Sequence, residues 1–371
     1  MFLCLRYYGC TMRILFLNNC PTDLLWSEWL EKKSPGQHLW GVNHLFEHGI
    51  YVDVLPYSKY EFLKKISNKI KLLGDLDQQL RTIPHLSKYD AVYCGCQHDT
   101  LVLGLMKRLG LIRVPIAIIV HHCIKPIFRN KLLFNLFYSS NDKFICLNEI
   151  VRHQLIDDFH ISPEKVTMLE WGVDTDFYDL DTDKISPQET PFIITAGRTL
   201  RDFNTLVEAF TNSPYHLKIY CTEDAEPTIE NIPPNVNIYS QKKLISSREI
   251  LPEYQKSFAI AVPMLEKKEQ LIGLTSLLDG MAVGKPIIMT RNQLVNIDIE
   301  KENIGIWVEP GDVQGWKNAI AYLFEHPEEA KAMGKRAKKL CETKYNTRIF
   351  ATKLACVLND IPTKKITIPS V

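Results

Sequence analysis

The stretch Phe192–Phe210, FIITAGRTLRDFNTLVEAF, decides the fold. It begins with an apolar run of strand length, Phe192–Ala196, and passes through a Gly-Arg turn into Asn204–Phe210, which has the pattern of a helix. A strand that is apolar throughout is expected to be buried on both faces, as in a parallel sheet. A buried strand followed by a turn and a helix therefore predicts a βαβ unit of a doubly wound parallel sheet.

The same alternation extends in both directions along the chain. His38 to His48 has helical spacing and is followed by Gly49, which predicts a helix that ends there. The chain from Asp312 to about Asp360 is expected to be mostly helical. Further strand-sized runs lie at Ile14–Leu17, Tyr51–Leu55, Ala91–Cys94, Ile116–Val120, Lys143–Leu147, Val166–Leu169, His216–Tyr220, Val236–Tyr239, Phe258–Val262 and Pro286–Met289.

A polar segment separates two series of strands and helices. Residues 179–191, DLDTDKISPQETP, contain two prolines and no periodic pattern, so we interpret them as a linker between two lobes. Met12 stands directly before the first apolar run. We therefore expect Met12 to be the start of the folded protein and residues 1–11 to be an extension. The sequence predicts an α/β protein with two Rossmann-like domains.

The composition excludes several classes of protein. The 371 residues are 46% hydrophobic and 23% charged, which excludes a disordered chain. The 44 basic and 43 acidic residues argue against a nucleic-acid partner. No apolar run approaches the roughly 20 residues that span a bilayer. Ten cysteines scattered without a secretory signal favour reduced thiols and a cytoplasmic protein.

Turns that follow strands are the places where open α/β sheets bind ligands. One such region is Gly273–Pro286, GLTSLLDGMAVGKP, where Thr275 or Ser276 is expected to be the N-cap of an apolar helix. The unpaired N–H groups at such a helix start suit a phosphate, and Asp279 lies one turn further on. The alternative interpretation, favoured for this segment taken alone, is a capped helix without a ligand.

A second candidate site follows the strand at Phe192–Ala196. Gly197 leads into Arg198 and Arg201, and two guanidinium groups three residues apart can hold a diphosphate through charged hydrogen bonds. The alternative is a solvated pair of surface arginines.

Other binding motifs are weaker. Gly280–Pro286 has the wrong spacing for a phosphate-binding Walker loop, and no GxGxxG sequence follows a strand. Cys94–His98 and His121–Cys123 follow two strands, but their spacings match no common zinc module, so we expect no metal site. We instead expect His121 to act as a hydrogen-bonding or acid–base group.

Two basic amphipathic segments suggest a surface partner. Lys59–Leu73 and Lys125–Tyr138 each combine lysines with an apolar stripe. Such helices can lie on an anionic membrane surface, which would make the protein peripheral at the inner face of the membrane. The alternative, which is commoner, is that the apolar stripe packs on the protein's own core.

Taken together, these segments resemble the GT-B glycosyltransferases of family 4, the glycosyl transferases group 1, over residues 12 to about 360. Glu170–Phe177, EWGVDTDF, resembles the family's NGVD motif, with Trp171 in place of the asparagine. Gly273–Pro286 resembles its G.T.LLEAMA.GKP motif. The further segments that carry the resemblance are Gly36–Val52, Val114–His121, Gly197–Leu206 and Val308–Asp312.

The resemblance implies a retaining, metal-independent transfer of a sugar from a UDP-, GDP- or ADP-linked donor to a saccharide or lipid-linked acceptor. It implies an acceptor domain at 12–178, a donor domain at 192–344, a helix at 345–360 that crosses back to the N-lobe, and a tail at 361–371. No cofactor is expected besides the donor substrate.

The resemblance also implies roles for single residues. The arginines would neutralise the leaving diphosphate, helix-start residues would donate hydrogen bonds to it, Asp279 would hold the ribose, and His121 would contact the transferred sugar. The implied catalytic residues are Arg198, Arg201 and His121, the implied donor-binding residues are Gly197, Gly273, Thr275, Ser276 and Asp279, and the implied acceptor-side loop contains Gly36 and Gln37.

The sequence departs from the family in its E-x7-E motif. Asp279 stands at the second glutamate and Leu271 at the first, with Glu269 nearby but out of register. The first glutamate helps hold the donor sugar in the family. Two alternatives therefore stay open beside an active transferase: a catalytically silent protein that binds a nucleotide sugar or a partner transferase, and another GT-B-like enzyme such as an epimerase or phosphorylase.

Overall fold

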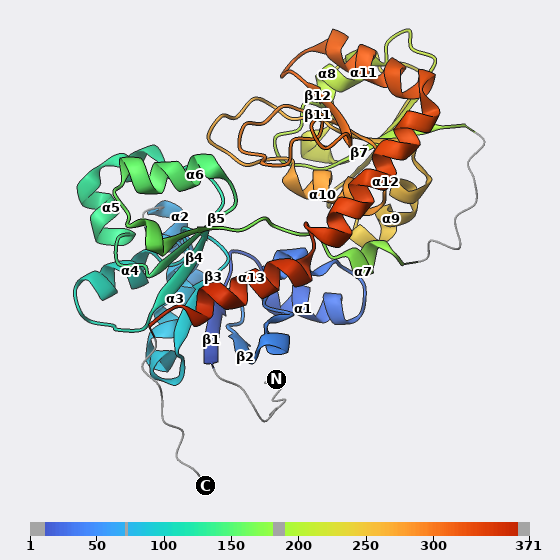
Figure 1. Ribbon diagram of the computed structural model, residues 1–371. Helices are drawn as coiled ribbons and strands as arrows, with labels where there is room; N and C mark the ends of the chain where they lie inside the picture. Colours follow the sequence, from blue (N-terminus) through green and yellow to red (C-terminus); the bar gives the residue numbers. More distant parts are fainter. Residues whose placement is uncertain (1–11, 71–72, 181–189, 363–371) are drawn as a thin grey trace. The chain divides into compact units, whose positions relative to one another are not determined.

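The computed structural model describes residues 12–70, 73–180 and 190–362 and contains two parallel β-sheets (Figure 1). The strands of the first sheet are β1 (Met12–Leu17), β2 (Ile50–Val54), β3 (Ala91–Cys94), β4 (Ile116–Val120), β5 (Lys143–Cys146) and β6 (Val166–Met168). Those of the second are β7 (Phe192–Ala196), β8 (His216–Thr222), β9 (Val236–Gln241), β10 (Ala259–Val262), β11 (Ile287–Thr290) and β12 (Gly305–Val308). The strand orders are β2-β1-β3-β4-β5-β6 and β12-β11-β10-β7-β8-β9.

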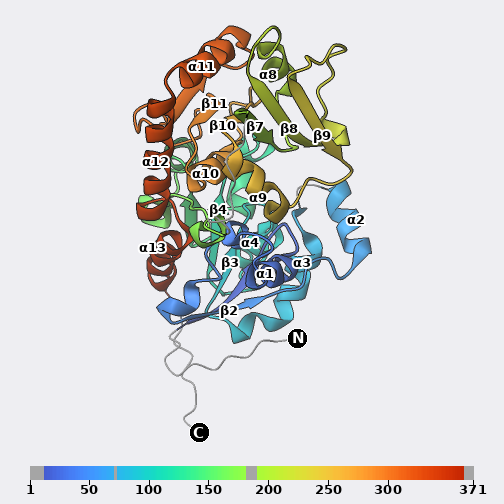
Figure 2. The same cartoon turned by 90° about the vertical axis from the view of Figure 1, so that its right-hand side faces the viewer.

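Helices flank both sheets (Figure 1, Figure 2), as the doubly wound fold predicted. The α-helices are α1 (Thr22–Leu30), α2 (Glu61–Lys69), α3 (Leu76–Thr82), α4 (Leu101–Arg108), α5 (Lys131–Phe137), α6 (Glu149–His153), α7 (Thr175–Tyr178), α8 (Phe203–Ala209), α9 (Ser247–Lys256), α10 (Leu274–Ala282), α11 (Val313–Glu325), α12 (Pro327–Thr343) and α13 (Thr347–Asn359). Short 3₁₀ helices lie at Gly36–Leu39, Leu45–His48, Ile83–Lys88, Pro126–Arg129, Pro163–Lys165 and Glu223–Ala225, and a π-helix lies at Gln154–Asp158.

The chain forms two compact units. The first holds the described residues up to Glu28, Gly36–Trp171, and the chain from Thr347 onward, so α13 belongs to it. The second holds Trp29–Pro35 and Gly172–Asn346. The expected extension at 1–11, most of the expected linker (181–189) and the tail from residue 363 lie outside the described residues.

The expected strands are all present, with ends shifted by a residue or two, whereas the helix expected over His38–His48 is wrong. Two short 3₁₀ helices stand there, because Trp40 and Gly41 have the left-handed φ values of 53° and 80°. A Cβ on Gly41 would lie 3.0 Å from the Phe350 ring and 3.3 Å from Ala351 Cα. Close packing against α13 therefore overrides the helical pattern of the sequence.

Each sheet has its own core. In the first unit, buried strand residues such as Ile118 and Phe144 pack with Phe134 and Tyr138 from α5 and its C-terminal end. In the second, Phe203 of α8 and Trp316 of α11 cover Ile219 and Ile288 of the sheet. Burial on both faces of the central strands β4, β7 and β10 explains why their sequences do not alternate between apolar and polar residues.

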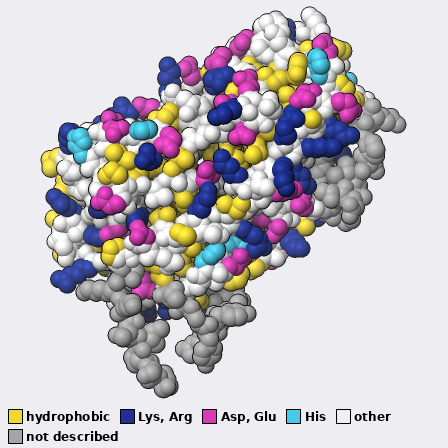
Figure 3. Space-filling view, in the orientation of Figure 1, with side chains coloured by type: hydrophobic (Ala, Val, Ile, Leu, Met, Phe, Trp, Pro, Cys, Tyr) yellow, Lys and Arg dark blue, Asp and Glu magenta, His cyan; other side chains and the backbone are white. Residues whose placement is uncertain are grey.

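The surface carries charges of both signs. On the face drawn in Figure 3, basic and acidic side chains are interspersed, in keeping with the near-neutral net charge. The eight cysteines in the described part of the chain are all free thiols, as expected. Within the described residues, no helix combines the length and apolar character needed to cross a bilayer.

Most of the second unit is one stretch of chain, Gly172–Asn346, and the two ends of this stretch lie side by side. Val173 N donates to Tyr345 O at 2.9 Å, and Val173 pairs with Asn346 in a parallel bridge. Gly172 makes this approach possible, because a Cβ there would lie 2.3 Å from the carbonyl carbon and oxygen of Asn346. Two of the points where the chain passes between units, after Trp171 and after Asn346, are thus fixed to each other by backbone contacts.

We predict that Gly172→Ala destabilises the protein by about 1–3 kcal/mol, because the added carbon overlaps backbone atoms that cannot rotate away. Chemical denaturation followed by circular dichroism measures the effect. The control is Gly110→Ala, where φ is 74° but nothing lies within 4 Å of the added carbon, and the cost is about 1 kcal/mol. If Gly172→Ala lowers the free energy of unfolding by no more than Gly110→Ala does, the packing argument is contradicted.

Candidate functional site

The loop after β7 is held in a fixed shape at the carboxyl end of the second sheet. Leu265 N donates to Leu200 O at 3.0 Å, and Asp202 N donates to Pro263 O at 3.2 Å, so the loop is bound to the one that follows β10. Gly197 has a φ of 152°, and a Cβ on it would lie 2.1 Å from Nε of Arg201. Glycine at this position therefore leaves the space that the Arg201 guanidinium occupies.

Arg201 is the central side chain of this edge of the sheet. Its Nη2 donates to Ser276 Oγ at 2.6 Å and to Ala196 O at 3.2 Å, and its Nη1 contacts Met264 Sδ. Nε is buried and has no hydrogen-bond partner within the described residues. Burial lowers the pKa of Arg201, and the nearby Tyr254 and Asp279 offset part of this effect.

The charge of Arg201 is incompletely balanced. Among the residues that the structure describes, Arg201 forms no ion pair, although Asp279 lies near enough to influence its pKa. A buried cation without a paired anion carries an unfavourable desolvation free energy. This arrangement is suited to an anionic ligand.

Helix α10 contributes its first turn to the same edge. Gly273, with a φ of 81°, is its N-cap, so the expectation that Thr275 or Ser276 caps the helix is wrong. Ser276 is instead buried in the first turn and bound to Arg201. A side chain at Gly273 would strike Met289 Cε at 2.7 Å. The first-turn N–H groups of an α-helix have no acceptor within the helix and favour anions.

Asp279 lies one turn further along α10 and is half-buried. Tyr178 Oη donates a 2.5 Å hydrogen bond to Asp279 Oδ1. Tyr178 itself is buried, and its carbonyl accepts from Gln255 Nε2 at 3.3 Å, so the phenol is held in place. The carboxylate therefore has a fixed orientation, which sequence reasoning did not foresee because Tyr178 is distant in the chain.

Arg198 points to a different partner. Its Nε and Nη2 lie 3.1 and 2.8 Å from Asp224 Oδ2, and both side chains are exposed. The structure therefore joins Arg201 to Ser276, but it shows Arg198 engaged with the loop after β8. Exposed ion pairs contribute only about 0–1 kcal/mol, so Arg198 can leave Asp224 at little cost.

The remaining candidate residues belong to the first unit. Gln37 is buried, and its carbonyl accepts from Trp171 Nε1 at 3.1 Å. Trp171 stacks on Trp40 with 4.7 Å between ring centroids, and Trp40 meets the ring of His121 edge-on at 4.5 Å. The loop that starts at Gly36 is therefore linked to His121 through two buried indoles. Trp171, which replaces the family's asparagine, supplies half of that link.

His121 is neutral at physiological pH. Burial lowers its pKa to about 4. Its Nε2 lies 2.6 Å from Gly95 O, and a carbonyl only accepts, so the neutral ring carries its proton on Nε2. Nδ1 is then a hydrogen-bond acceptor. Of the two roles expected for His121, this geometry favours hydrogen bonding over acid–base chemistry near neutral pH.

The cysteine and histidine cluster is engaged in other contacts. Cys94 Sγ donates to Cys96 O at 3.1 Å, and His98 Nδ1 lies 2.8 Å from Tyr138 Oη. Burial raises the pKa of both thiols, which disfavours the thiolate that binds metals. No group of three or more His, Cys, Asp or Glu side chains in the described ranges is arranged to hold a metal ion.

Two family models match this sequence. Residues 38–177 match the model of Glycosyltransferase Family 4, and residues 181–340 match that of Glycosyl transferases group 1. The matches follow each other along the chain and leave unmatched only residues 178–180 and the two ends. The chain belongs to the GT-B glycosyltransferases of family 4, in agreement with the resemblance seen in the sequence.

Individual proteins agree with this assignment. The D-rhamnosyltransferase WbpZ of Pseudomonas aeruginosa is 24% identical over 200 residues, which are 47% of this chain and 48% of that relative, so the match spans about half of each. A glycosyltransferase structure from Rickettsia africae superposes with a TM-score of 0.65 at 17% identity, covering 95% of this chain and 100% of that one. The structure of HepE from Anabaena in complex with UDP-glucose superposes with a TM-score of 0.65 at 15% identity, covering 94% of this chain and 100% of that one. These structures confirm the fold.

We predict that the stability of the protein falls as the pH drops from about 6.5 toward 4. In this range the unfolded chain protonates His121, whose ordinary pKa is about 6.5, while the folded protein, with a pKa of about 4, does not. His98, whose pKa burial lowers to about 3, acts in the same direction. The measurement is the urea midpoint at pH 7 and pH 5.

The His121→Gln variant should lose less stability over this range than the wild type. The reference is the wild type measured under the same conditions. An unchanged pH dependence in His121→Gln would show that this histidine is not held neutral by the fold.

Proposed function

We propose that this glycosyltransferase moves a sugar from a nucleotide-linked donor to a saccharide or lipid-linked acceptor, with retention of configuration and without a metal ion. The observation that carries the proposal is the Arg201 guanidinium, buried at the edge of the second sheet without an ion-pair partner among the described residues. A leaving diphosphate supplies the anion that this group lacks.

The groups around Arg201 are those that stabilise a departing phosphate. In sugar transfer from a nucleotide, the bond between the anomeric carbon and the diphosphate oxygen breaks, and negative charge develops on that oxygen. Arg201, the Ser276 hydroxyl and the first turn of α10 would offer donors that need little rearrangement when this charge appears. Arg198 would exchange Asp224 for the diphosphate.

The nucleotide would extend toward Asp279. A carboxylate fixed by Tyr178 at 2.5 Å is suited to accept hydrogen bonds from the two hydroxyls of a ribose. This role does not depend on the base, so UDP-, GDP- and ADP-linked sugars all remain donors to be tested. The UDP-glucose bound to HepE supports a nucleotide sugar as the class of ligand.

The first unit would supply the acceptor side. Neutral His121 would accept a hydrogen bond from a hydroxyl of the transferred sugar through Nδ1, and the Gly36–Gln37 loop would contact the acceptor. The positive charge needed at the diphosphate is supplied by arginines and a helix start, so the mechanism requires no metal ion. Retention would follow if the acceptor hydroxyl oxygen bonds to the anomeric carbon on the face that the diphosphate leaves, while the hydroxyl proton passes to the departing phosphate oxygen.

Leu271 favours one alternative. It stands where the family has a glutamate that helps hold the donor sugar, and Asp279 replaces the second glutamate. A protein that binds a nucleotide sugar without turning it over would tolerate these changes. Binding without turnover is the result that would distinguish this alternative from an active transferase.

The test is a panel of UDP-, GDP- and ADP-linked hexoses and deoxyhexoses, D-rhamnose included, incubated with purified protein. We expect one nucleotide class to be hydrolysed slowly alone and faster with an acceptor, at a rate that EDTA does not change. Proton NMR of the product should show the anomeric configuration of the donor. An inverted product would refute retention, and tight binding of a donor without any turnover would refute the active enzyme.

We predict that Arg201→Ala lowers donor turnover by ~10²-fold or more, because it removes the buried charge beside the leaving group. The matched control is Arg336→Ala, which removes an arginine of the same unit that pairs with Glu329 on the surface of α12. It should leave turnover unchanged. Equal rates for wild type and Arg201→Ala would remove Arg201 from the mechanism.

A further inference from the structure

Helix α2 is unusual among the helices of the first unit because none of its residues is buried. Phe62 is 62% exposed, Ile66 38% and Ile70, just past the end of the helix, 50%. Residues at i, i+4 and i+8 lie on one face of a helix, so these three side chains form a continuous apolar strip. Contiguous exposed apolar surface of this kind marks an interaction site.

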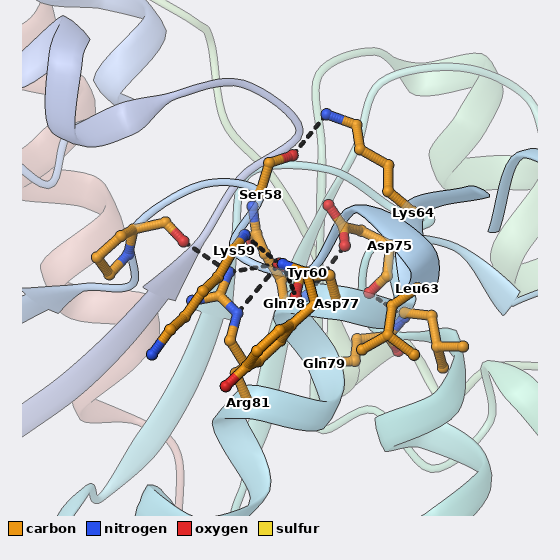
Figure 4. A network of polar contacts seen from close by, with 12 residues as sticks. Ser58, Lys59, Tyr60, Leu63, Lys64, Asp75, Asp77, Gln78, Gln79 and Arg81 are labelled. Atoms are coloured by element: carbon orange, nitrogen blue, oxygen red, sulfur yellow. Dashed lines mark hydrogen bonds and ion pairs between the residues drawn. The ribbon is translucent and has the colours of Figure 1, made fainter. Parts of the chain in front are cut away.

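The outward position of α2 is built into the fold. Asp77 of α3 is buried and accepts hydrogen bonds from Lys59 N at 2.9 Å and Tyr60 N at 3.0 Å, immediately before α2 (Figure 4). Arg81 donates to the same carboxylate and to Pro56 O, both at 2.6 Å. This network fixes the start of α2 through its backbone, and Phe62, Lys65, Ile66 and Lys69 of the helix are exposed.

The lysines of α2 divide into two groups. Lys64 turns toward the protein: its Nζ lies 2.5 Å from Ser58 Oγ and 4.5 Å from the centre of the Tyr57 ring. Lys65 and Lys69 are exposed. At about 3.6 residues per turn, these two lie beside Phe62 and Ile66 on the outer surface of the helix. The exposed face thus combines an apolar strip with a border of positive charge.

The other basic segment behaves differently. In Lys125–Tyr138, the aromatic residues Phe128, Phe134, Phe137 and Tyr138 are buried in the core of the first unit. Packing on the protein's own core, the alternative expected from the sequence, accounts for these aromatic residues, whereas Ile127 and Leu132 are 56% and 67% exposed on two different short helices. Nothing in the described core covers the strip of α2.

We propose that α2 is a docking surface for an anionic lipid bilayer. Its Phe62, Ile66 and Ile70 would enter the boundary between headgroups and acyl chains, while Lys65 and Lys69 contact anionic headgroups. A helix that combines aromatic and aliphatic residues with flanking lysines has the composition of interfacial membrane helices. Protein–protein interfaces, in contrast, are depleted of lysine at their centres. The charge of α2 therefore favours lipid as the occupant.

The test is co-sedimentation of the full chain with vesicles of mixed phosphatidylglycerol and phosphatidylcholine, or of phosphatidylcholine alone, at low and high salt. We expect binding to the anionic vesicles at low salt. Each lysine near an anionic surface contributes about fivefold to partitioning, so Lys65→Gln with Lys69→Gln should weaken binding by about 25-fold. Phe62→Ser with Ile66→Ser should weaken it at least ~10-fold through lost apolar contact.

The matched control is Lys331→Gln with Lys335→Gln, which removes two exposed lysines from α12, a helix whose apolar face is buried. It should bind vesicles as the wild type does. All variants should keep the circular dichroism and thermal midpoint of the wild type, since none changes a buried residue.

A second readout is hydrogen exchange of residues 61–70, which should slow when anionic vesicles are added. Absence of wild-type binding to anionic vesicles would overturn the proposal. So would equal binding by the α2 variants, as expected if α2 docks a protein instead. The proposed function assigns α2 no part in donor hydrolysis in solution, so the donor assay and the vesicle assay can fail independently of each other.

Discussion

The buried charge of Arg201 is the constraint on which the architecture of the second unit's candidate site depends. Its guanidinium lies against the carboxyl end of β7, donates to Ser276 at 2.6 Å, and keeps one nitrogen without a partner in the described part of the chain. Gly197 is free of a side chain because a Cβ would overlap that guanidinium at 2.1 Å. The loop backbones, the glycine and the first turn of α10 all pack around this one cation at the carboxyl edge of the sheet.

Much of the fold could be predicted because the strands of a parallel sheet are buried on both faces. Such burial leaves uninterrupted apolar runs, as in Ile116–Val120, whose expected limits match β4. The helix expected over His38–His48 failed for a tertiary reason: Gly41 packs against α13, more than three hundred residues later in the chain. A local pattern cannot report such a contact. The strand β12 was also missed, since Gly305–Val308 is only four residues long and begins with a glycine.

The candidate site was partly visible in the sequence. The order of the motifs along the chain pointed to Arg201 and Ser276 as site residues, and in the structure their side chains are hydrogen-bonded to each other. The sequence could not show that Arg198 pairs with Asp224 or that Tyr178 orients Asp279, because both contacts join distant segments. The two basic segments looked alike in sequence, and only packing separates the buried aromatic residues near α5 from the exposed strip of α2.

The most direct measurement is calorimetric titration of UDP, GDP and ADP into the wild type and into Arg201→Ala. If the buried guanidinium is the diphosphate-binding group, one nucleotide should bind the wild type and raise its thermal midpoint by mass action. The same nucleotide should bind Arg201→Ala at least ~10-fold more weakly, as expected for loss of a charged hydrogen-bond donor. Equal affinity of both proteins for that nucleotide would contradict the account.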